Sequence, residues 1–347
     1  MLFMMISIFS SVWWQNLWDE LILKNEIKIL EKKYSKDTKF VVFSYDPQNP
    51  FLRKSNIVYK EYFPIWIRKF SNILINIKNF YYFFYYVFKS DLIVIWWGWI
   101  IYDTENQSTR EPLDQWLFRS KVFNFFNKKV LFFSVWLNIK NQFNYHKVKE
   151  IFSGSEVTVR DSYSQKLLKE LWVASTIVRD PVFSEVIPVN RKSMIIKRVR
   201  SYDFTCNDLS DINLEWKKVA LAIRKWYLIK SWLEKNNIEE DNIVNEIIDY
   251  ILKKWWEVIL LPHSFHKTDY LANDYLFLNN FLRINQKVRI VSSMQDVYNK
   301  YIYKEFDLCL AMRLHSIILS QVYWIPFVWI SYSKKTDETL DYIESLN

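Results

Sequence analysis

The chain has only two glycines, Gly98 and Gly154, among 347 residues, beside 17 tryptophans. Average usage predicts roughly 24 glycines in a chain of this length. Turns with φ > 0, helix C′ positions and close approaches of the backbone to a ligand all favour glycine, because a Cβ atom clashes there. A large α/β protein cannot build its turns from two glycines, so other residues must occupy those positions.

Tryptophans stand where glycine is expected. Trp96, Trp97 and Trp99 directly follow an apolar run, Trp172 follows a helical pattern, and Trp324 lies between a helical and a strand pattern. Abundant Ile, Lys, Asn, Phe and Tyr indicate AT-rich codons, which account for few glycines but not for many tryptophans. Our hypothesis is that UGA codons, read as glycine in the source organism, are written here as Trp. The alternative is a genuinely Trp-rich protein, and the codons at these positions decide between the two.

The remaining composition is that of a globular protein, with 50% hydrophobic and 24% charged residues. This balance excludes a disordered chain, a collagen and a disulfide-stapled miniprotein. Cys206 and Cys309 are too few for a disulfide framework, and no signal-peptide pattern opens the chain, so we predict reduced thiols and a cytoplasmic protein. The net charge of +9 favours an anionic lipid, polyphosphate or glycan, and no nucleic-acid motif accompanies it.

Residues 1–185 alternate between strand and helix patterns, which predicts a parallel sheet with helices on both faces. A polar, basic stretch at 186–215 is expected to be a linker, and residues 216–347 repeat the alternation. The architecture we expect is two Rossmann-like domains facing a cleft, similar to the GT-B glycosyltransferases. The expected strands are 5–12, 40–45, 91–95, 130–135, 157–159, 176–178, 218–223, 257–261, 288–291, 306–311 and 327–331; the expected helices are 19–32, 67–88, 113–127, 162–171, 243–254, 270–281, 294–303 and 316–323.

An aromatic run at 79–89 is the best candidate for a peripheral membrane contact. Only nine residues lie between its polar ends, which is too few to span a bilayer. A buried helix and a helix lying on the inner face of the membrane both fit the pattern, and we favour burial.

The N-terminal half offers candidate ligand contacts at two predicted glycine loops. If Trp is replaced by Gly, each loop follows a buried strand, where backbone N–H groups approach an anion or a sugar phosphate. Asn16 and Asp19 adjoin the first loop, although Asp19 is expected mainly as a helix N-cap. Asp103 follows the second loop as a candidate acceptor for a hydroxyl group.

In the C-terminal half, Arg313 and His315 flank a predicted helix N-terminus directly after a strand. An arginine fork and a helix dipole at one place favour a phosphate or carboxylate, and the imidazole is available for proton transfer. Arg224 ends the first strand of the same sheet. His263, after Pro262, is a candidate contact to donor or acceptor. For each of these residues a capping or structural role is the alternative.

At these positions the sequence resembles the polysaccharide pyruvyl transferases, in chain order and over most of its length. That family has glycine at Trp18, Trp96, Trp97, Trp99, Trp136, Trp172 and Trp324. The motifs are Asn16-Leu-Trp-Asp-Glu20, Ser44-Tyr-Asp-Pro47, Asp91, residues 96–99 with Asp103, Val159-Arg-Asp161 with Ser164, Asp180-Pro-Val-Phe183, Ile223-Arg224, Leu261-Pro-His263, Arg313-Leu-His315-Ser316, and Trp324-Ile-Pro326 with Tyr332-Ser-Lys334.

The resemblance implies transfer of a pyruvyl group from phosphoenolpyruvate to two hydroxyls of one sugar in a cell-envelope glycan or its precursor. It implies that Arg313 holds the donor, that His315 is the general acid/base, and that Arg224 and, more weakly, Arg160 bind the donor; Arg160 could instead pair with a carboxylate. We expect no metal and no cofactor besides the donor substrate. The chain ends abruptly for this family, where we expect a further helix.

Two other functions stay open. A glycosyltransferase with paired Rossmann-like domains would use a nucleotide sugar, although such a site more often carries a carboxylate for the ribose. A non-catalytic glycan-binding relative would bind without turnover, and Arg313 and His315 would then be dispensable.

Overall fold

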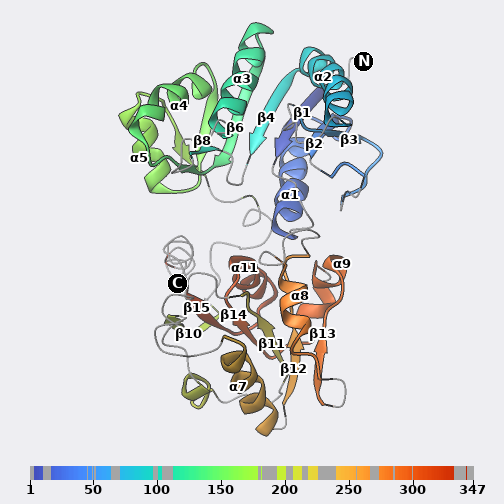
Figure 1. Cartoon of the computed structure of the whole chain (residues 1–347), viewed down its shortest axis with the longest axis vertical. Helices are drawn as coiled ribbons and strands as arrows, with labels where there is room; N and C mark the ends of the chain where they lie inside the picture. The colour runs from blue at the N-terminus through green and yellow to red at the C-terminus, as the bar shows by residue number, and fades with distance from the viewer. Residues whose placement is uncertain are drawn as a thin grey trace. The chain divides into compact units, whose positions relative to one another are not determined.

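The computed structural model describes residues 4–10, 17–44, 46–48, 50, 52–63, 71–96, 101–103, 112–178, 181, 194–200, 206–212, 218–225, 240–254, 256–265, 273–283, 286–298, 300–331 and 341. The chain forms two compact units (Figure 1). Unit 1 comprises residues 1–13 and 19–185, and unit 2 comprises residues 14–18 and 186–347. Each unit is described separately below.

Unit 1 is built on a seven-stranded sheet in the order β3-β2-β1-β4-β6-β8-β9, and every strand pair is parallel. The chain reverses its direction of winding between β1 and β4, whose ends pair at Ser10 and Trp96. Both predicted glycine loops start at this point, and residues 11–16 and 97–100 within them lie outside the described part. The strands are β1 (Met5–Ser10), β2 (Lys39–Ser44), β3 (Ile57–Glu61), β4 (Leu92–Trp96), β6 (Lys129–Val135), β8 (Glu156–Val159) and β9 (Thr176–Ile177), beside a two-stranded pair of β5 (Ile101–Tyr102) and β7 (Leu137–Asn138).

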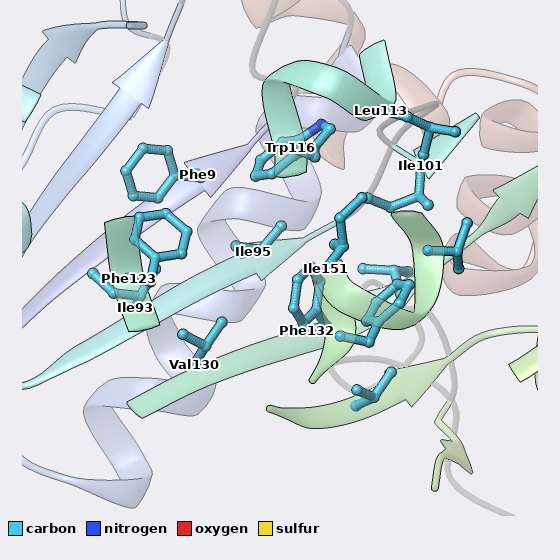
Figure 2. Packing of buried hydrophobic residues seen from close by; sticks show 14 of the residues in the cluster. Phe9, Ile93, Ile95, Ile101, Leu113, Trp116, Phe123, Val130, Phe132 and Ile151 are labelled. Carbon is cyan, nitrogen blue, oxygen red and sulfur yellow. The ribbon is translucent and has the colours of Figure 1, made fainter. Parts of the chain in front are cut away.

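The core of unit 1 lies between one face of this sheet and helices α2 to α5. Side chains alternate along a strand, so Phe9, Ile93 and Ile95 point to the same face and pack with Trp116 and Phe123 of α3 (Figure 2). The intervening strand residues are buried as well, which is typical of a parallel sheet covered on both faces. The helices are α1 (Leu17–Lys33), α2 (Ser71–Lys89), α3 (Pro112–Phe125), α4 (Tyr145–Phe152) and α5 (Ser162–Glu170), with a 3-10 helix η1 (Gln142–Asn144).

Unit 2 has a second parallel sheet, in the order β10-β15-β14-β11-β12-β13. Its core packs Val219, Leu221 and Leu310 against Ile247 and Ile248 of α7. The strands are β10 (Ile195–Arg200), β11 (Lys218–Ala222), β12 (Glu257–Leu260), β13 (Val288–Ile290), β14 (Leu308–Ala311) and β15 (Phe327–Ser331); the helices are η3 (Cys206–Leu209), α7 (Glu240–Lys253), α8 (Asp274–Asn279), α9 (Met294–Tyr298), α10 (Lys300–Tyr303) and α11 (Leu314–Tyr323).

Part of the stretch expected to be a linker is structured. β10 (Ile195–Arg200) lies inside residues 186–215 and pairs in parallel with β15. It is an edge strand of the sheet, and edge strands tolerate charged side chains such as Lys197 and Arg198. The basic character that suggested a linker is therefore that of a sheet edge.

Two tryptophans adopt the left-handed backbone conformation that favours glycine. The φ angles are 61° at Trp172 and 62° at Trp324. After α5, the Val173 N–H donates to the Leu168 carbonyl and the Trp172 N–H to that of Lys169, which is the Schellman pattern with Trp172 at C′. At Trp96, the buried indole nitrogen has no hydrogen-bond partner among the described residues, which is unfavourable for a polar group. The backbone conformations of Trp172 and Trp324 fit the recoding hypothesis, which stays a prediction.

Candidate active site

The winding of unit 2 reverses between β11 and β14, which lie side by side. In open α/β sheets, ligands bind beyond the carboxyl ends of the strands at such a point. The Ala222 carbonyl at the end of β11 accepts hydrogen bonds from the backbone N–H groups of Met312 (3.1 Å) and Arg313 (3.3 Å), directly after β14. Arg224 follows the same β11 end, so both predicted arginines leave the sheet at its switch point.

α11 begins immediately after this junction. Arg313 occupies the N-cap position in an extended conformation, with φ −77° and ψ 133°, and the helix runs from Leu314. The Ser316 hydroxyl donates to the Arg313 carbonyl over 2.6 Å, which fixes the first turn. His315 lies in that turn with 9% of its surface exposed. The positive end of the helix dipole and the two side chains are therefore together, as predicted.

Asp274, which sequence reasoning did not single out, holds Arg313 in place. Arg313 Nε donates to Asp274 Oδ2 over 2.8 Å, and Nη2 pairs with Oδ1. The pair is bidentate, which fixes the plane of the guanidinium group. Asp274 is buried in the first turn of α8, whose cap is Asn273. Because the Asn273 side chain accepts the Leu276 N–H, α8 begins at Asp274 and not at residue 270 as expected.

His263 is committed to protein partners at both ring nitrogens. Nδ1 lies 3.1 Å from the Leu261 carbonyl and Nε2 lies 3.0 Å from the Tyr303 hydroxyl. Because a carbonyl only accepts, Nδ1 carries the proton and Nε2 accepts from Tyr303. Burial lowers the pKa of His263 to about 4, although Asp274 opposes this shift. His263 is thus a neutral, buried residue, and a direct ligand contact is not the role its hydrogen bonds indicate.

These side chains form one connected cluster. The His263 backbone N–H donates to Asp274 Oδ2 over 3.2 Å, and the His263 and His315 rings lie 6.2 Å apart between centroids. Arg313, Asp274, His263 and Tyr303 are thereby linked by hydrogen bonds, with His315 beside them. Nothing local in the sequence indicates Asp274 or Tyr303, because each lies about 40 positions from its partner.

In unit 1, Asp103 has a structural role. Its carboxylate accepts the backbone N–H groups of Lys140 and Asn141, each over 2.8 Å, and the Asn144 side-chain amide over 3.2 Å. These bonds hold the segment after β7 against the end of β5. A contact between Asp103 and a sugar hydroxyl stays a prediction. The carboxylate would have to accept that hydrogen bond in addition to the three it already accepts.

The other candidates of unit 1 are placed as follows. The Arg160 guanidinium lies 5.8 Å from the ring centre of Trp136, and Asp161 caps α5 by accepting the Ser164 N–H. Asp19 is in the first turn of α1 and not at its cap, because the helix already begins at Leu17. An acidic residue there is favoured by the helix dipole. Asn16 lies outside the described residues.

Within the described residues, no group of three or more His, Cys, Asp or Glu side chains could hold a metal ion. The expectation of a metal-free and cofactor-free reaction stays a prediction.

A search of solved structures finds proteins similar to this chain. A UDP-GlcNAc 2-epimerase from Methanocaldococcus jannaschii aligns over 97% of this chain and 87% of its own, with 13% identity and a TM-score of 0.52. A glycosyltransferase from Rickettsia africae aligns over 100% and 89%, with 12% identity and a TM-score of 0.43. At such identities the likeness concerns the fold alone. The chain is an α/β protein of two Rossmann-like units, each built on a parallel sheet.

The family is given by the sequence. A family model described as polysaccharide pyruvyl transferase matches residues 19–334. The chain therefore belongs to the polysaccharide pyruvyl transferase family, and it is a transferase. No match was found among curated proteins.

Proposed function

We propose that this protein transfers a pyruvyl group from phosphoenolpyruvate to a sugar of a cell-envelope glycan or its precursor, forming a cyclic ketal. The observation that carries the proposal is the junction of β14 and α11 in a member of this family. There an arginine and a histidine meet a helix N-terminus at the switch point of a parallel sheet. This is a site for an anionic donor with a proton-transfer group beside it.

The reaction requires two things from the protein, a group that holds the donor and a group that moves protons. One sugar hydroxyl adds through its oxygen to C2 of phosphoenolpyruvate and loses its proton, while C3 gains a proton and becomes a methyl group. The second hydroxyl then adds to C2 and loses its proton, and the C–O bond to phosphate breaks, so that phosphate carries away the electron pair. A cationic group must hold the donor, and an acid/base must move protons at the hydroxyl and at C3.

We assign Arg313 to the donor's carboxylate or phosphate, with Arg224 as a second donor contact. Asp274 orients the guanidinium fork of Arg313 and is a positioning residue. His315 serves as the general acid/base. We further propose that the reaction needs no metal and takes place in the cytoplasm, with a glycan or a lipid-linked sugar as acceptor.

The test is a His315→Gln variant assayed for phosphate release and for ketal-bound pyruvate with phosphoenolpyruvate and envelope glycan extracts. We expect loss of product with an unchanged melting temperature, because His315 is assigned to the chemistry. The matched control is His146→Gln, at an exposed position in α4, which should retain activity. Full activity of His315→Gln would overturn the assignment.

The same assay separates the other candidate functions. Phosphate release from phosphoenolpyruvate supports pyruvyl transfer, whereas thermal shifts and turnover with nucleotide sugars alone would indicate a glycosyltransferase. Glycan binding without turnover would indicate a non-catalytic relative. Both the chain as written and a chain with glycine at the seven family positions should be assayed, since bulky residues in the glycine loops would obstruct a ligand.

A further inference from the structure

α2 is apolar on two opposite faces. At 100° per residue, Asn79, Phe83 and Val87 fall on one side of the helix, and all three are buried. The opposite side carries a stripe of exposed side chains, and a surface helix would normally be polar there. The stripe consists of Ile77, Tyr81, Tyr85 and Phe88, with the exposed Phe80 at its edge next to the buried side.

The stripe continues onto the end of α3. Phe126 lies 6.2 Å from Phe84 and 5.9 Å from Phe88, and its neighbour Phe125 lies 5.1 Å from it, all between ring centres. Phe125 is 82% exposed. The outer stripe of α2 and Phe125 together form one apolar surface, which we call the aromatic face. A large exposed apolar patch on a globular protein marks a surface that is covered by a partner.

Positive charges border the aromatic face. Lys78 and Lys89 are exposed and lie three turns apart along the same edge of the stripe. Residues 71–90, which comprise α2 and the residue after it, contain no Asp or Glu. The acidic residue of α3, Asp114, is paired with Lys147.

We propose that the aromatic face docks on a bilayer containing anionic lipid, with α2 lying in the plane of the membrane surface. Phenylalanine, tyrosine and isoleucine side chains enter the boundary between headgroups and acyl chains, and lysines on the rim attract anionic headgroups. Among the described residues, none of the helices combines the length and hydropathy of a membrane-spanning segment.

The charge pattern argues against a second copy of the chain as the occupant. A two-fold interface pairs a surface with itself, so Lys78 and Lys89 at the rim would meet the same lysines of the second copy, with no acidic residue of α2 to balance them. Juxtaposed like charges weaken such an interface. An anionic bilayer supplies the missing negative charge.

The experiment is co-sedimentation of the full chain with phosphatidylcholine vesicles, with and without about one third phosphatidylglycerol. We expect binding to the anionic vesicles that weakens as salt is added. Phe125→Ser and Tyr81→Ser should each lower the partition coefficient about three- to tenfold, because part of an aromatic side chain leaves the membrane. Lys78→Glu combined with Lys89→Glu should remove the preference for anionic lipid.

Phe143→Ser is the matched control. Phe143 is 84% exposed in η1, outside the aromatic face, and its replacement should leave binding unchanged. Equal effects of Phe125→Ser and Phe143→Ser would overturn the proposal. So would an absence of vesicle binding, or a dimer in light scattering that Tyr81→Ser dissociates. Melting curves of each variant ensure that a loss of binding is not a loss of fold. The assay needs no phosphoenolpyruvate, so its outcome is independent of the proposed reaction.

Discussion

Replacement of Trp172 by glycine and by alanine gives a quantitative test of the unusual composition. Trp172 is 88% exposed and has φ 61°. Both variants lose the same indole contacts, so they differ in backbone terms alone. The left-handed conformation costs a residue with a Cβ about 1–2 kcal/mol, and the greater chain entropy of glycine offsets about 0.5–1 kcal/mol of this. Trp172→Gly should therefore be more stable than Trp172→Ala by about 1 kcal/mol, or roughly 2–4 °C in melting temperature.

In the control position, Trp116, the stability difference between the glycine and alanine variants should have the opposite sign. Trp116 lies inside α3, and there glycine should be less stable than alanine by about 1 kcal/mol because helix interiors disfavour it. Thermal and urea unfolding of the full chain measure both differences. Equal stability of the two Trp172 variants, or the same sign at both sites, would refute the reasoning from backbone conformation. Separately, UGG codons at Trp172 and Trp324 would refute the recoding hypothesis, whereas UGA codons are expected.

Two predictions concern the buried cluster of unit 2. Asp274→Asn should destabilise the protein by about 3 kcal/mol, because Arg313 keeps its charge in a largely buried place; a loss below about 1 kcal/mol in urea unfolding would contradict a buried pair. The folded state holds the pKa of His263 near 4, whereas an unfolded chain has a value near 6.5. Between pH 4 and pH 6.5 the His263 side chain is protonated in the unfolded state but not in the folded state. The free energy of unfolding should therefore rise by about 3 kcal/mol as the pH is raised across this range, and it should level off above it. His263→Gln should flatten this pH dependence, and an unchanged slope would show that another group causes it.

Most of the fold was predictable because its strands are strongly apolar. β1, β2, β4 and β6 are largely apolar, with a single serine inside β1 (Ser7) and inside β6 (Ser134), and their parallel pairing follows from the helices between them. The sequence does not predict β3 (Ile57–Glu61), a short strand at the edge of the sheet. Its apolar Val58 is exposed and Lys60 is charged, so the strand shows no regular alternation of apolar and polar residues. α4 was missed too, because a helix of eight residues offers barely two turns of periodicity.

The site was predictable only where its residues are neighbours in sequence. Arg313 and His315 are recognisable in the sequence because they directly follow a strand pattern and precede a helical pattern. The helix begins close to where that pattern predicts. Asp274 and Tyr303 come from α8 and α10, and only the tertiary structure brings them to Arg313 and His263. Asp103 illustrates the converse: a carboxylate after a glycine loop suggests a ligand contact, yet backbone N–H groups 37 and 38 positions away occupy it.

The Ala222 carbonyl, which accepts two backbone hydrogen bonds, has a consequence for how the site tolerates substitution. The backbone N–H groups of Met312 and Arg313 join β14 to β11. The distance in space between the backbones of Arg224 and Arg313 is therefore set by the sheet and not by side-chain contacts. Neighbouring side chains can therefore be substituted without separating the two arginines. Substitutions of the side chains around this backbone junction are therefore expected to leave the positions of the two proposed donor contacts unchanged.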